Sequence, residues 1–343
     1  MTTPDWYVFQ GSGEPHDGIA RLPAPPPWRD FDGGPALTEA PPLGSESVRR
    51  LGTRGARALA WRPEELELIN AALYLRRPLL VTGDPGSGKS TLAHAIAHEL
   101  GLGRVLHWPV VSRTTLRDGL YAYDAIARLQ DIQMAREMGR PHTEDIGGYL
   151  RLGPLGTALL PYDRPRVLLV DELDKSDIDL PNDLLNTLEE GEFGIPELER
   201  IARKQPTAEV LTDDGRQAAL TGGKVRCRAF PVVVLTSNGE RDFPAPLLRR
   251  CIHLDLPSPK NDEWGAGRLS AMVRAHFGDR DTEDHEELIR HFLQSSPGSL
   301  RAADQLLNAI YLTQEALRDN RPDRRRLAEL LMRPLDHGDH GTR

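Results

Sequence analysis

Five short apolar runs are spread along the chain, and segments with helical periodicity separate most of them. Each run is short enough for a buried strand. Buried strands that alternate with helices form a mainly parallel sheet covered on both faces. The pattern therefore predicts an α/β fold with a five-stranded parallel core. The runs are PLLVTG (78–83), VLHWPV (105–110), RVLLVDE (166–172), PVVVLTSN (231–238) and CIHLDL (251–256).

The segments around these runs add helices and one hairpin. Pro63 opens a helix-like segment at 63–75. A long insertion at 112–163 precedes the third strand and holds a predicted helix, DAIARLQDIQMAREMG, which ends at Gly139. Residues 208–230, just before the fourth strand, predict a β-hairpin. Its turn is expected at Asp214-Gly215 or at Gly222-Gly223.

The same patterns divide the chain into three regions. Residues 1–60 are rich in Pro and Gly, and we expect them to form an extension that straps onto the core rather than a free tail. Residues 61–258 form the α/β core with the insertion at 112–163. Residues 259–343 form a small all-helical lid domain and a C-terminal tail. The candidate anchors of the extension are Ile19, Leu22, Trp28 and Phe31.

A glycine-rich stretch that follows the first strand and opens a helix matches the pattern GxxxxGK[ST]. In a P-loop of this kind, backbone N–H groups surround phosphate, the lysine neutralises the β- and γ-oxygens, and the serine binds Mg²⁺. A chance glycine-rich turn is disfavoured because the strand and the helix are both in place. The expected nucleotide-binding residues are Gly83, Asp84, Pro85, Gly86, Ser87, Gly88, Lys89, Ser90 and Thr91.

The third strand ends on two adjacent carboxylates, Asp171 and Glu172. Open α/β sheets bind ligands at the carboxyl ends of their strands. We expect Asp171 to join Ser90 at Mg²⁺, and Glu172 to orient and deprotonate the attacking water. Two neighbouring carboxylates repel each other, so a nearby cation explains them both. Asp174 and Lys175 are interpreted as helix-start and surface charges rather than catalytic groups.

Polar residues after the fourth strand extend this site. Asn238 ends a strand expected in the same sheet as Asp171, and its amide could hold the water or a phosphate oxygen. Arg249 and Arg250 end the next helix, where cations could simply offset the helix dipole. In a ring of subunits they could instead reach the neighbour's phosphates, and such an arginine can contribute ~10³–10⁵ in rate. Arg250 is the first candidate for this finger.

One more arginine belongs to the helical region. Arg301 falls in the first turn of a predicted helix for which Ser299 is a plausible N-cap. The helix dipole disfavours a cation at that end. A contact from Arg301 to the nucleotide explains its presence, and it would let the nucleotide set the angle between the two domains.

Charge and composition restrict the partners. The 343 residues have a formal net charge of -8, which disfavours general attraction to nucleic acid or to an anionic membrane. The basic run Arg324-Arg325-Arg326 is interpreted as a solvated helix face. Cys227 and Cys251 have no metal-ligand spacing and are expected to be buried thiols. Without a signal peptide or a long apolar span, we expect a soluble cytoplasmic protein.

These motifs together resemble the AAA+ ATPases over residues 62–335, and within them the MoxR group. The finer resemblance rests on the insertion before the third strand, on LGPLGTALL (152–160), on the hairpin ahead of Asn238, and on VDELDKSDIDLPNDLLNTLEEGEF where that group usually carries a DEINRA-type segment. Two positions depart from the group. Leu173-Asp174-Lys175 replaces the common Ile-Asn-Arg, and Arg249 stands where an Asp is frequent.

The resemblance implies an αβα core with strand order 5-1-4-3-2, a C-terminal lid and a homo-oligomeric ring, commonly a hexamer. It also implies ATP and Mg²⁺ as ligands, and ATP-driven, chaperone-like remodelling of a partner that often carries a von Willebrand A domain. The extension at 1–60 resembles that of MoxR-like ATPases encoded beside such partners in bacterial conflict-type gene sets. Two alternatives stay open: a nucleotide-gated scaffold or switch in a defence or signalling complex, and a DNA-associated NTPase subunit.

Overall fold

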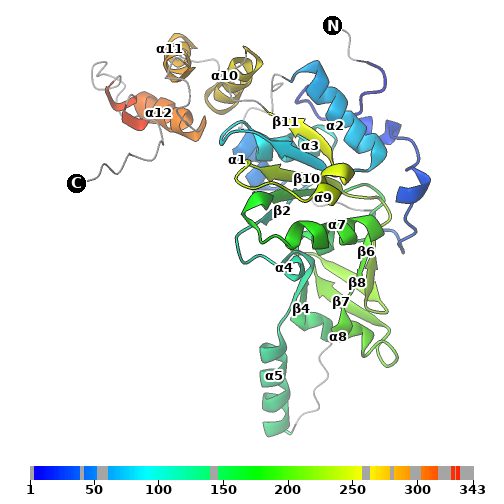
Figure 1. Cartoon of the computed structure of the whole chain (residues 1–343). Helices are drawn as coiled ribbons and strands as arrows, with labels where there is room; N and C mark the ends of the chain where they lie inside the picture. The colour runs from blue at the N-terminus through cyan, green and yellow to red at the C-terminus, as the bar shows by residue number, and fades with distance from the viewer. Residues whose placement is uncertain are drawn as a thin grey trace.

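The structure is a computed structural model of the 343-residue chain. It describes residues 4–38, 42–51, 61–139, 146–256, 263–278, 282–293, 303–315, 326–328 and 330–332. An α/β core occupies the middle of the molecule, a smaller extension projects from one side of it, and a group of helices lies on another side (Figure 1).

The core sheet has five strands, and every neighbouring pair is parallel. Its order is β11-β1-β10-β5-β2, which is 5-1-4-3-2 when the five strands are counted along the chain. The predicted α/β class with a parallel five-stranded core is confirmed. The strands are β1 (Leu79–Thr82), β2 (Leu106–Pro109), β5 (Val167–Asp171), β10 (Val232–Ser237) and β11 (Ile252–Asp255).

Both faces of this sheet are buried. Alternate side chains of the central strands β1, β5 and β10 enter two separate apolar clusters: Leu80 lies in one, while Leu79 and Val81 lie in the other. This is why the central strands are almost entirely apolar, whereas the edge strands β2 and β11 alternate apolar with polar or exposed residues. The helices that cover the sheet or lie beside it are α1 (Ser45–Leu51), α2 (Pro63–Leu75), α3 (Lys89–Glu99), α7 (Leu180–Glu190) and α9 (Ala245–Arg250).

The extension contains the insertion and the predicted hairpin. β7 and β8 pair antiparallel, with Asp214-Gly215 in the turn, so the hairpin is confirmed. The order in their sheet is β3-β4-β7-β8, and β6 pairs with β9. The strands here are β3 (Tyr121–Tyr123), β4 (Leu150–Leu152), β6 (Glu192–Gly194), β7 (Thr207–Leu211), β8 (Gln217–Thr221) and β9 (Lys224–Arg226). The helices are α4 (Leu116–Leu120), α5 (Ala125–Glu137), η3 (Ile146–Tyr149), α6 (Pro154–Ala158) and α8 (Pro196–Glu199).

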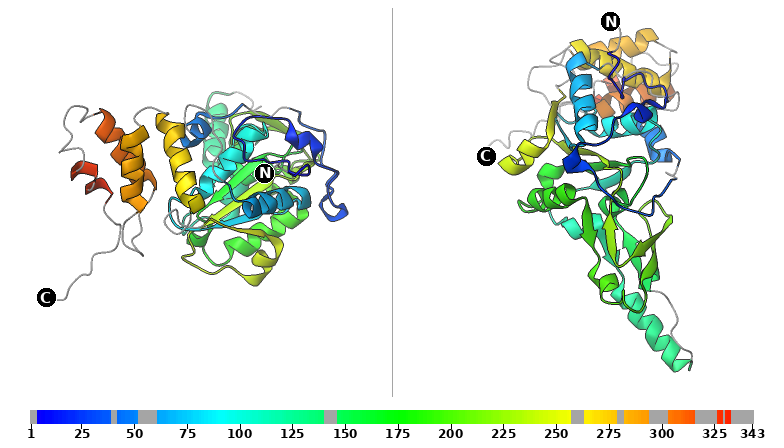
Figure 2. Two further views of the ribbon diagram at one scale, coloured as in Figure 1. Left: turned by 90° about the horizontal axis from the view of Figure 1, so that it is seen from above. Right: turned by 90° about the vertical axis from the view of Figure 1, so that its right-hand side faces the viewer.

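Helix α5 is the predicted helix of the insertion, and it projects well away from the rest of the molecule (Figures 1 and 2). The Asp124 side chain caps it by accepting a hydrogen bond from the N–H of Ala127. None of its residues is buried. A propensity-driven helix with one good cap therefore stands here without a core of its own.

The N-terminal residues 4–38 cross the core with two short 3₁₀ turns, η1 (Gly18–Arg21) and η2 (Pro27–Arg29). The Asn70 amide of α2 pairs with the backbone of Val8 and Phe9, which are fully buried. Neither residue is among the anchors expected from the sequence. Of its four candidates, Ile19 is buried but Trp28 is 73% exposed, so the interpretation of Trp28 is wrong.

Helix α1 was not expected, because residues 1–60 were predicted only as a Pro- and Gly-rich extension on the core. Its Glu46 carboxylate is 3.5 Å from Nδ1 of His107 in β2.

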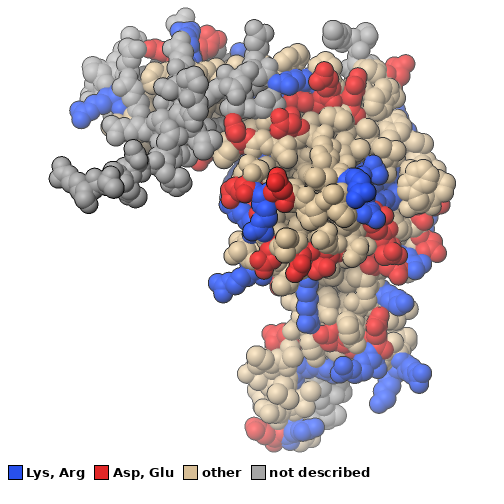
Figure 3. Space-filling model, in the orientation of Figure 1, with Lys and Arg blue, Asp and Glu red and all other residues tan. Residues whose placement is uncertain are grey.

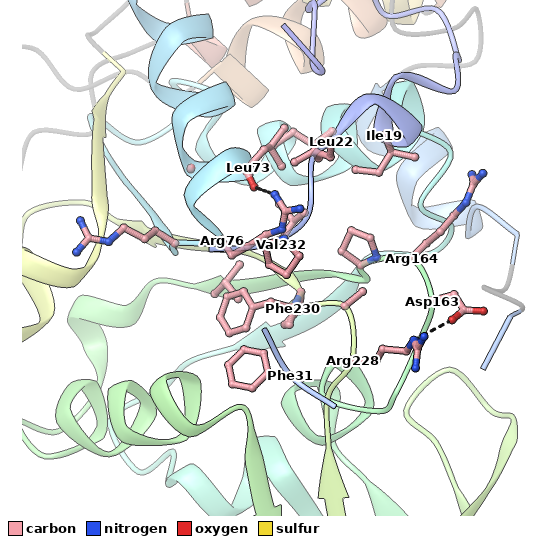
Figure 4. Close-up of a pocket in the computed structure, with 18 of the residues that line it drawn as sticks. Ile19, Leu22, Phe31, Leu73, Arg76, Asp163, Arg164, Arg228, Phe230 and Val232 are labelled. Atoms are coloured by element: carbon pink, nitrogen blue, oxygen red, sulfur yellow. Dashed lines mark hydrogen bonds and ion pairs between the residues drawn. The ribbon is translucent and has the colours of Figure 1, made fainter. Parts of the chain in front are cut away.

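A pocket of about 670 Å³ lies at the amino end of the core sheet, under the N-terminal segment. Figure 4 shows Leu22 and Phe31 on its walls.

Among the described residues, the C-terminal group includes the helices α10 (Glu263–Phe277), α11 (Thr282–Leu293) and α12 (Ala303–Glu315). They share an apolar cluster with Ala328 and Met332. Arg268 of α10 pairs at 2.6 Å with Glu65 of α2, and both side chains are buried. Among the described residues, no helix is long and apolar enough to cross a bilayer.

On the face shown in Figure 3, acidic and basic side chains are interspersed over the core and the extension. This face therefore has no general basic surface. Of the basic run, Arg326 is described and exposed, while Arg324 and Arg325 lie outside the described residues.

Cys227 and Cys251 are free and buried, as expected. Burial raises the pKa of each thiol to about 12.

Candidate functional site

The glycine-rich loop connects β1 to α3, as the P-loop pattern requires. Gly83, Gly86 and Gly88 have φ angles of 143°, 79° and 94°, values that L side chains rarely adopt. A Cβ on Gly83 would lie 2.1 Å from the carbonyl oxygen of Leu256, so backbone from β11's end packs directly against the loop. The loop therefore needs glycine at these positions, and it leads directly into the first turn of α3.

Lys89 folds back over this loop. Its ammonium donates hydrogen bonds to the carbonyls of Gly83 at 2.6 Å and Asp84 at 2.8 Å. Burial lowers the pKa of Lys89, although carboxylates led by that of Asp174 act in the opposite direction. The Ser87 hydroxyl is buried without a hydrogen-bond partner in the structure. A polar group of this kind usually has a ligand or water as its partner, and a phosphate oxygen fits it.

Asp171 is the centre of the polar network at the carboxyl end of β5. Its Oδ1 accepts hydrogen bonds from Ser90 Oγ at 2.7 Å and from Thr236 Oγ1 at 2.6 Å. His107 Nε2 lies 3.3 Å from Oδ2. Burial by itself raises the pKa of Asp171, but the hydrogen bonds from His107, Thr236 and Ser90 outweigh it and hold the pKa well below its usual range. The carboxylate is therefore charged and fixed in direction.

Glu172 leaves the strand in an unusual conformation. Its φ of 61° and ψ of 47° are left-handed, which is uncommon for a residue with a side chain. Its N–H donates to Thr236 Oγ1 at 2.8 Å. Its carboxylate pairs with Lys175 Nζ at 2.7 Å and is 44% exposed. The turn places this carboxylate on the surface of the site, where water can reach it.

Asp174 is not the surface charge that the sequence suggested. It is 3% exposed, and its Oδ2 accepts hydrogen bonds from the N–H groups of Asn238 at 3.0 Å and Glu240 at 3.1 Å. A buried carboxylate with two backbone donors shapes the loop that follows β10. Asp174 does lie at the start of a short helix, η4 (Leu173–Lys175), as expected, but its interpretation as a surface charge is wrong because the turn after β5 points this side chain inward. Lys175, by contrast, is exposed as expected.

Asn238 follows β10, which is the direct neighbour of β5 in the sheet. The expected adjacency of the two strands is therefore confirmed. The side chain of Asn238 is half-buried. Its backbone contact with Asp174 links the two strand ends that carry the predicted water-binding groups.

The two candidate finger residues lie at the end of α9. Arg249 donates to the carbonyl of Ala245 in its own helix, and Arg250 Nε lies 3.4 Å from Glu189 Oε1. Both arginines are exposed in the single chain. Arg301 and Ser299 lie outside the described residues.

Three polar side chains of this site were not assigned to it from the sequence: His107, Thr236 and Asp174. A histidine inside an otherwise apolar strand was a usable signal for the first. Thr236 looks like an ordinary β-branched strand residue, and only its position beside Asp171 in the sheet reveals its role. Nothing in the local sequence indicates that the side chain of Asp174 turns inward.

The donor set decides which metal the site could hold. Among the described residues, no group of three or more His, Cys, Asp and Glu side chains is arranged around a metal position. The Ser90 hydroxyl and the Asp171 carboxylate are hard oxygen donors held together. Mg²⁺ commonly uses one or two protein ligands and completes its shell with phosphate and water. These residues therefore fit Mg²⁺ bound together with a nucleotide.

A family model for AAA domains of the dynein-related subfamily matches residues 78–251, slightly more than half of the chain. Among solved structures, NtrX from Brucella abortus in complex with ATP is 13% identical and matches over 84% of this chain and 72% of that chain, with a TM-score of 0.35. PCH-2 from C. elegans is 13% identical over 84% of this chain and 70% of that chain, with a TM-score of 0.38. Structural likeness this low carries no argument about function.

Proposed function

Because the chain belongs to the family of AAA domains of the dynein-related subfamily, and is an ATPase, we propose that it works as a ring. In this proposal the ring is homo-oligomeric, commonly hexameric, and binds ATP with Mg²⁺ at its subunit interfaces. Hydrolysis then remodels or activates a partner protein. The finer resemblance to MoxR-like ATPases supports a partner with a von Willebrand A domain.

The hydrogen-bond network around Asp171 is the main observation that supports the roles proposed for individual residues in hydrolysis. Hydrogen bonds from Ser90 and Thr236 meet on one carboxylate oxygen and join α3, β5 and β10. The same Thr236 hydroxyl accepts the N–H of Glu172. One hydroxyl thus connects the carboxylate of the proposed metal ligand to the backbone of the proposed base.

Each residue of the P-loop has a proposed role toward the nucleotide. The backbone N–H groups of 83–88, apart from Pro85, which has none, and the amino end of α3 bind the phosphates, and Thr91 lies in the same first turn. Lys89 exchanges its loop carbonyls for the β- and γ-phosphate oxygens. Ser90 and Asp171 hold the Mg²⁺. The metal, when bound, neutralises charge that develops on the phosphates.

The remaining groups act on water and on the leaving phosphate. Glu172 takes a proton from the attacking water, and the Asn238 amide holds that water or a γ-phosphate oxygen. Arg250, with Arg249 as the second candidate, reaches the neighbouring subunit's γ-phosphate. Arg301 is proposed to contact the nucleotide from the helical region.

A nucleotide-gated scaffold is the second candidate function, and a DNA-associated NTPase is a less favoured third. The scaffold needs ATP binding but only slow turnover. The presence of Glu172, Asn238 and Arg250, which serve hydrolysis rather than binding, favours the motor. A turnover rate that stays negligible with ring and partner both present supports the scaffold, whereas turnover stimulated by DNA and steeply dependent on salt supports the third.

The Glu172→Gln variant tests the proposal. It keeps the Mg²⁺ ligands and loses the base, so we expect ATP binding and ring assembly with hydrolysis at least ~10²-fold slower. Light scattering with ATP gives the ring size. Proteins retained by this variant with ATP, and not without it, are partner candidates.

Two further results decide the outcome. A retained protein must stimulate the wild-type ATPase to count as the partner. Asp177→Asn, an exposed carboxylate five residues further along, is the control and should leave hydrolysis unchanged. Undiminished hydrolysis by Glu172→Gln would contradict the assigned base.

A further inference from the structure

Two arginines from distant parts of the chain meet on one carboxylate oxygen. Glu189, next to the last residue of α7, has its Oε1 2.6 Å from Arg29 Nη2 and 3.4 Å from Arg250 Nε. Arg29 belongs to the N-terminal segment, and Arg250 is the first candidate for the arginine finger. Glu189 thus connects the N-terminal segment (residues 4–38) to the arginine that is proposed to act across the subunit interface.

Arg29 is held much more firmly than a surface arginine. It is 5% exposed, and its Nη1 donates a hydrogen bond to the carbonyl of Leu188 at 2.6 Å. Its guanidinium lies 5.0 Å from the ring centroid of Phe230. A cation at the carboxyl end of a helix also satisfies free carbonyls there and interacts favourably with the dipole. Burial, stacking and helix capping together fix Arg29, and Arg29 fixes Glu189.

The chain beyond Arg29 is seated on the same end of α7. Phe31 stacks on Phe230 with ring centroids 5.9 Å apart, and Figure 4 shows these two rings side by side. A Cβ on Gly191 would lie 2.6 Å from the Phe31 ring, so the glycine that ends α7 admits this ring. Gly33 donates its N–H to the carbonyl of Cys227. Arg29 is therefore placed by its neighbours as well as by its own contacts.

We propose that Glu189 is a positioning residue that holds the Arg250 guanidinium ready for the neighbouring subunit's nucleotide, and that Arg29 of the N-terminal segment is the fixed support of this carboxylate. The proposal rests on the proposed function, in which Arg250 acts across a subunit interface. It assigns to the N-terminal segment a role in hydrolysis at the adjacent site.

The strengths of the two contacts suit this task. An exposed ion pair usually contributes a factor of only ~5 or less, because two long side chains must be ordered. Here Arg29 has already ordered Glu189, so only Arg250 loses freedom. Arg29 also offsets part of the carboxylate charge, which leaves Arg250 weakly held. A weakly held arginine can transfer to a phosphate, whose charge is greater, without a large opposing cost.

Steady-state hydrolysis of Glu189→Gln gives the first test. We expect kcat to fall roughly 5- to 20-fold and the KM for ATP to change less than ~2-fold, because the subunit's own nucleotide pocket is intact. Glu190→Gln is the matched control: it is the next residue of the same helix, carries the same charge change and is exposed. It should behave as wild type. An equal effect of both variants, or a loss expressed mainly in KM, would overturn the proposal.

Mixed rings separate an effect on the neighbour from an effect within the subunit. Glu172→Gln subunits keep Glu189 and Arg250 but cannot hydrolyse. Added to Glu189→Gln subunits, they should raise hydrolysis per competent site toward that of wild-type subunits mixed in the same ratio. If hydrolysis per competent site does not rise at any ratio, Glu189 acts within its own subunit and the proposal fails.

Two other measurements distinguish this failure from failure of the proposed function. If Arg250→Ala leaves hydrolysis unchanged, the assignment of Arg250 as the finger fails, and the positioning role of Glu189 fails with it. If Arg250→Ala abolishes hydrolysis while Glu189→Gln does not lower it, only the positioning role of Glu189 is wrong.

A double-mutant cycle between Glu189→Gln and Arg250→Gln, measured by urea unfolding, tests the contact between the two side chains without ATP. We expect a coupling of ~2- to 5-fold in the unfolding constant that disappears in the Arg29→Met background; no coupling, or the same coupling without Arg29, contradicts the support role.

Discussion

The hydroxyl of Thr236 donates a hydrogen bond of 2.6 Å to Oδ1 of Asp171, and the two residues sit on adjacent strands of the core sheet. The same oxygen of Thr236 accepts the N–H of Glu172 at 2.8 Å. Because a hydroxyl can donate once and accept elsewhere, it can fix two neighbouring residues at the same time. The left-handed turn at Glu172 follows directly after this anchored carboxylate.

Replacing Thr236 by Val should disrupt this arrangement with little change of side-chain volume. The N–H of Glu172 loses its partner, and we expect a stability loss of about 1–2 kcal/mol. Displacement of the Glu172 carboxylate should lower kcat about 10- to 100-fold. Thr236→Ser keeps the hydroxyl and is the matched control, for which we expect kcat within ~3-fold of wild type. Urea unfolding and steady-state hydrolysis measure the two effects, and equal kcat values for the Val and Ser variants would show that the hydroxyl has no role.

Lys89 gives a test of nucleotide binding that is separate from turnover. Its ammonium is largely buried and lies on loop carbonyls, so Lys89→Met removes the positive charge without opening a large gap. A charge-assisted hydrogen bond to phosphate contributes about 1.5–3 kcal/mol, and we expect the Kd for a fluorescent ATP analogue to rise roughly 10- to 100-fold. Lys204→Met, an exposed lysine on the extension, is the control and should bind as wild type. Equal affinities for both variants would remove Lys89 from the phosphate site.

The sequence predicted those parts of the site that local chemistry specifies. The glycines at 83, 86 and 88 are visible in a sequence because only glycine adopts those backbone angles freely, and Asp171 is visible because a charge ends an apolar strand. The order of the strands came from the resemblance to a family, since nothing in a single strand states its neighbour. What local patterns predict well is therefore the identity of individual groups.

Contacts between distant segments were predicted poorly. Asp174 looks like a helix-start residue, and its burial depends on a turn whose partners lie 64 and 66 residues further along the chain. One predicted anchor of the N-terminal segment was also misjudged: Trp28 is exposed, while Arg29 beside it is buried by α7 and Phe230. Hydrophobicity alone favoured the tryptophan, but a guanidinium that finds a carbonyl, a carboxylate and a ring together is the better anchor.

Mixing two inactive variants tests the arrangement of the site across subunits. Arg250→Ala removes the proposed finger, and Glu172→Gln removes the proposed base. Each alone should reduce hydrolysis at least ~10²-fold. In mixed rings, an Arg250→Ala subunit with its intact base can meet the intact finger of a Glu172→Gln neighbour, so some hydrolysis should return. Arg249→Ala in place of Arg250→Ala shows which arginine acts, and a mixture without recovery at every ratio would mean that the arginine does not act on a neighbour.

A buried histidine behind the P-loop predicts how stability depends on pH. His94 of α3 is 1% exposed, and its Nδ1 lies 2.9 Å from the Ser47 hydroxyl of α1. Burial first, and then the charge of Arg50, lowers its pKa from 6.5 to about 4, although Glu46 acts in the opposite direction. Between these two values the unfolded chain binds a proton that the folded chain does not. The folded state is therefore destabilised as the pH falls below 6.5.

From pH 7 to pH 5 this proton uptake should reduce the free energy of unfolding by about 2 kcal/mol. Urea unfolding of the wild type and of His94→Gln at both pH values measures it, because the variant lacks the titrating group. We expect the difference between the two pH values to shrink by that amount in His94→Gln, whatever its stability at pH 7. His98→Gln, one turn further along α3 and half-exposed, should keep the wild-type difference. A His94→Gln variant with an undiminished pH dependence would show that this imidazole is already protonated, or solvated, in the folded state.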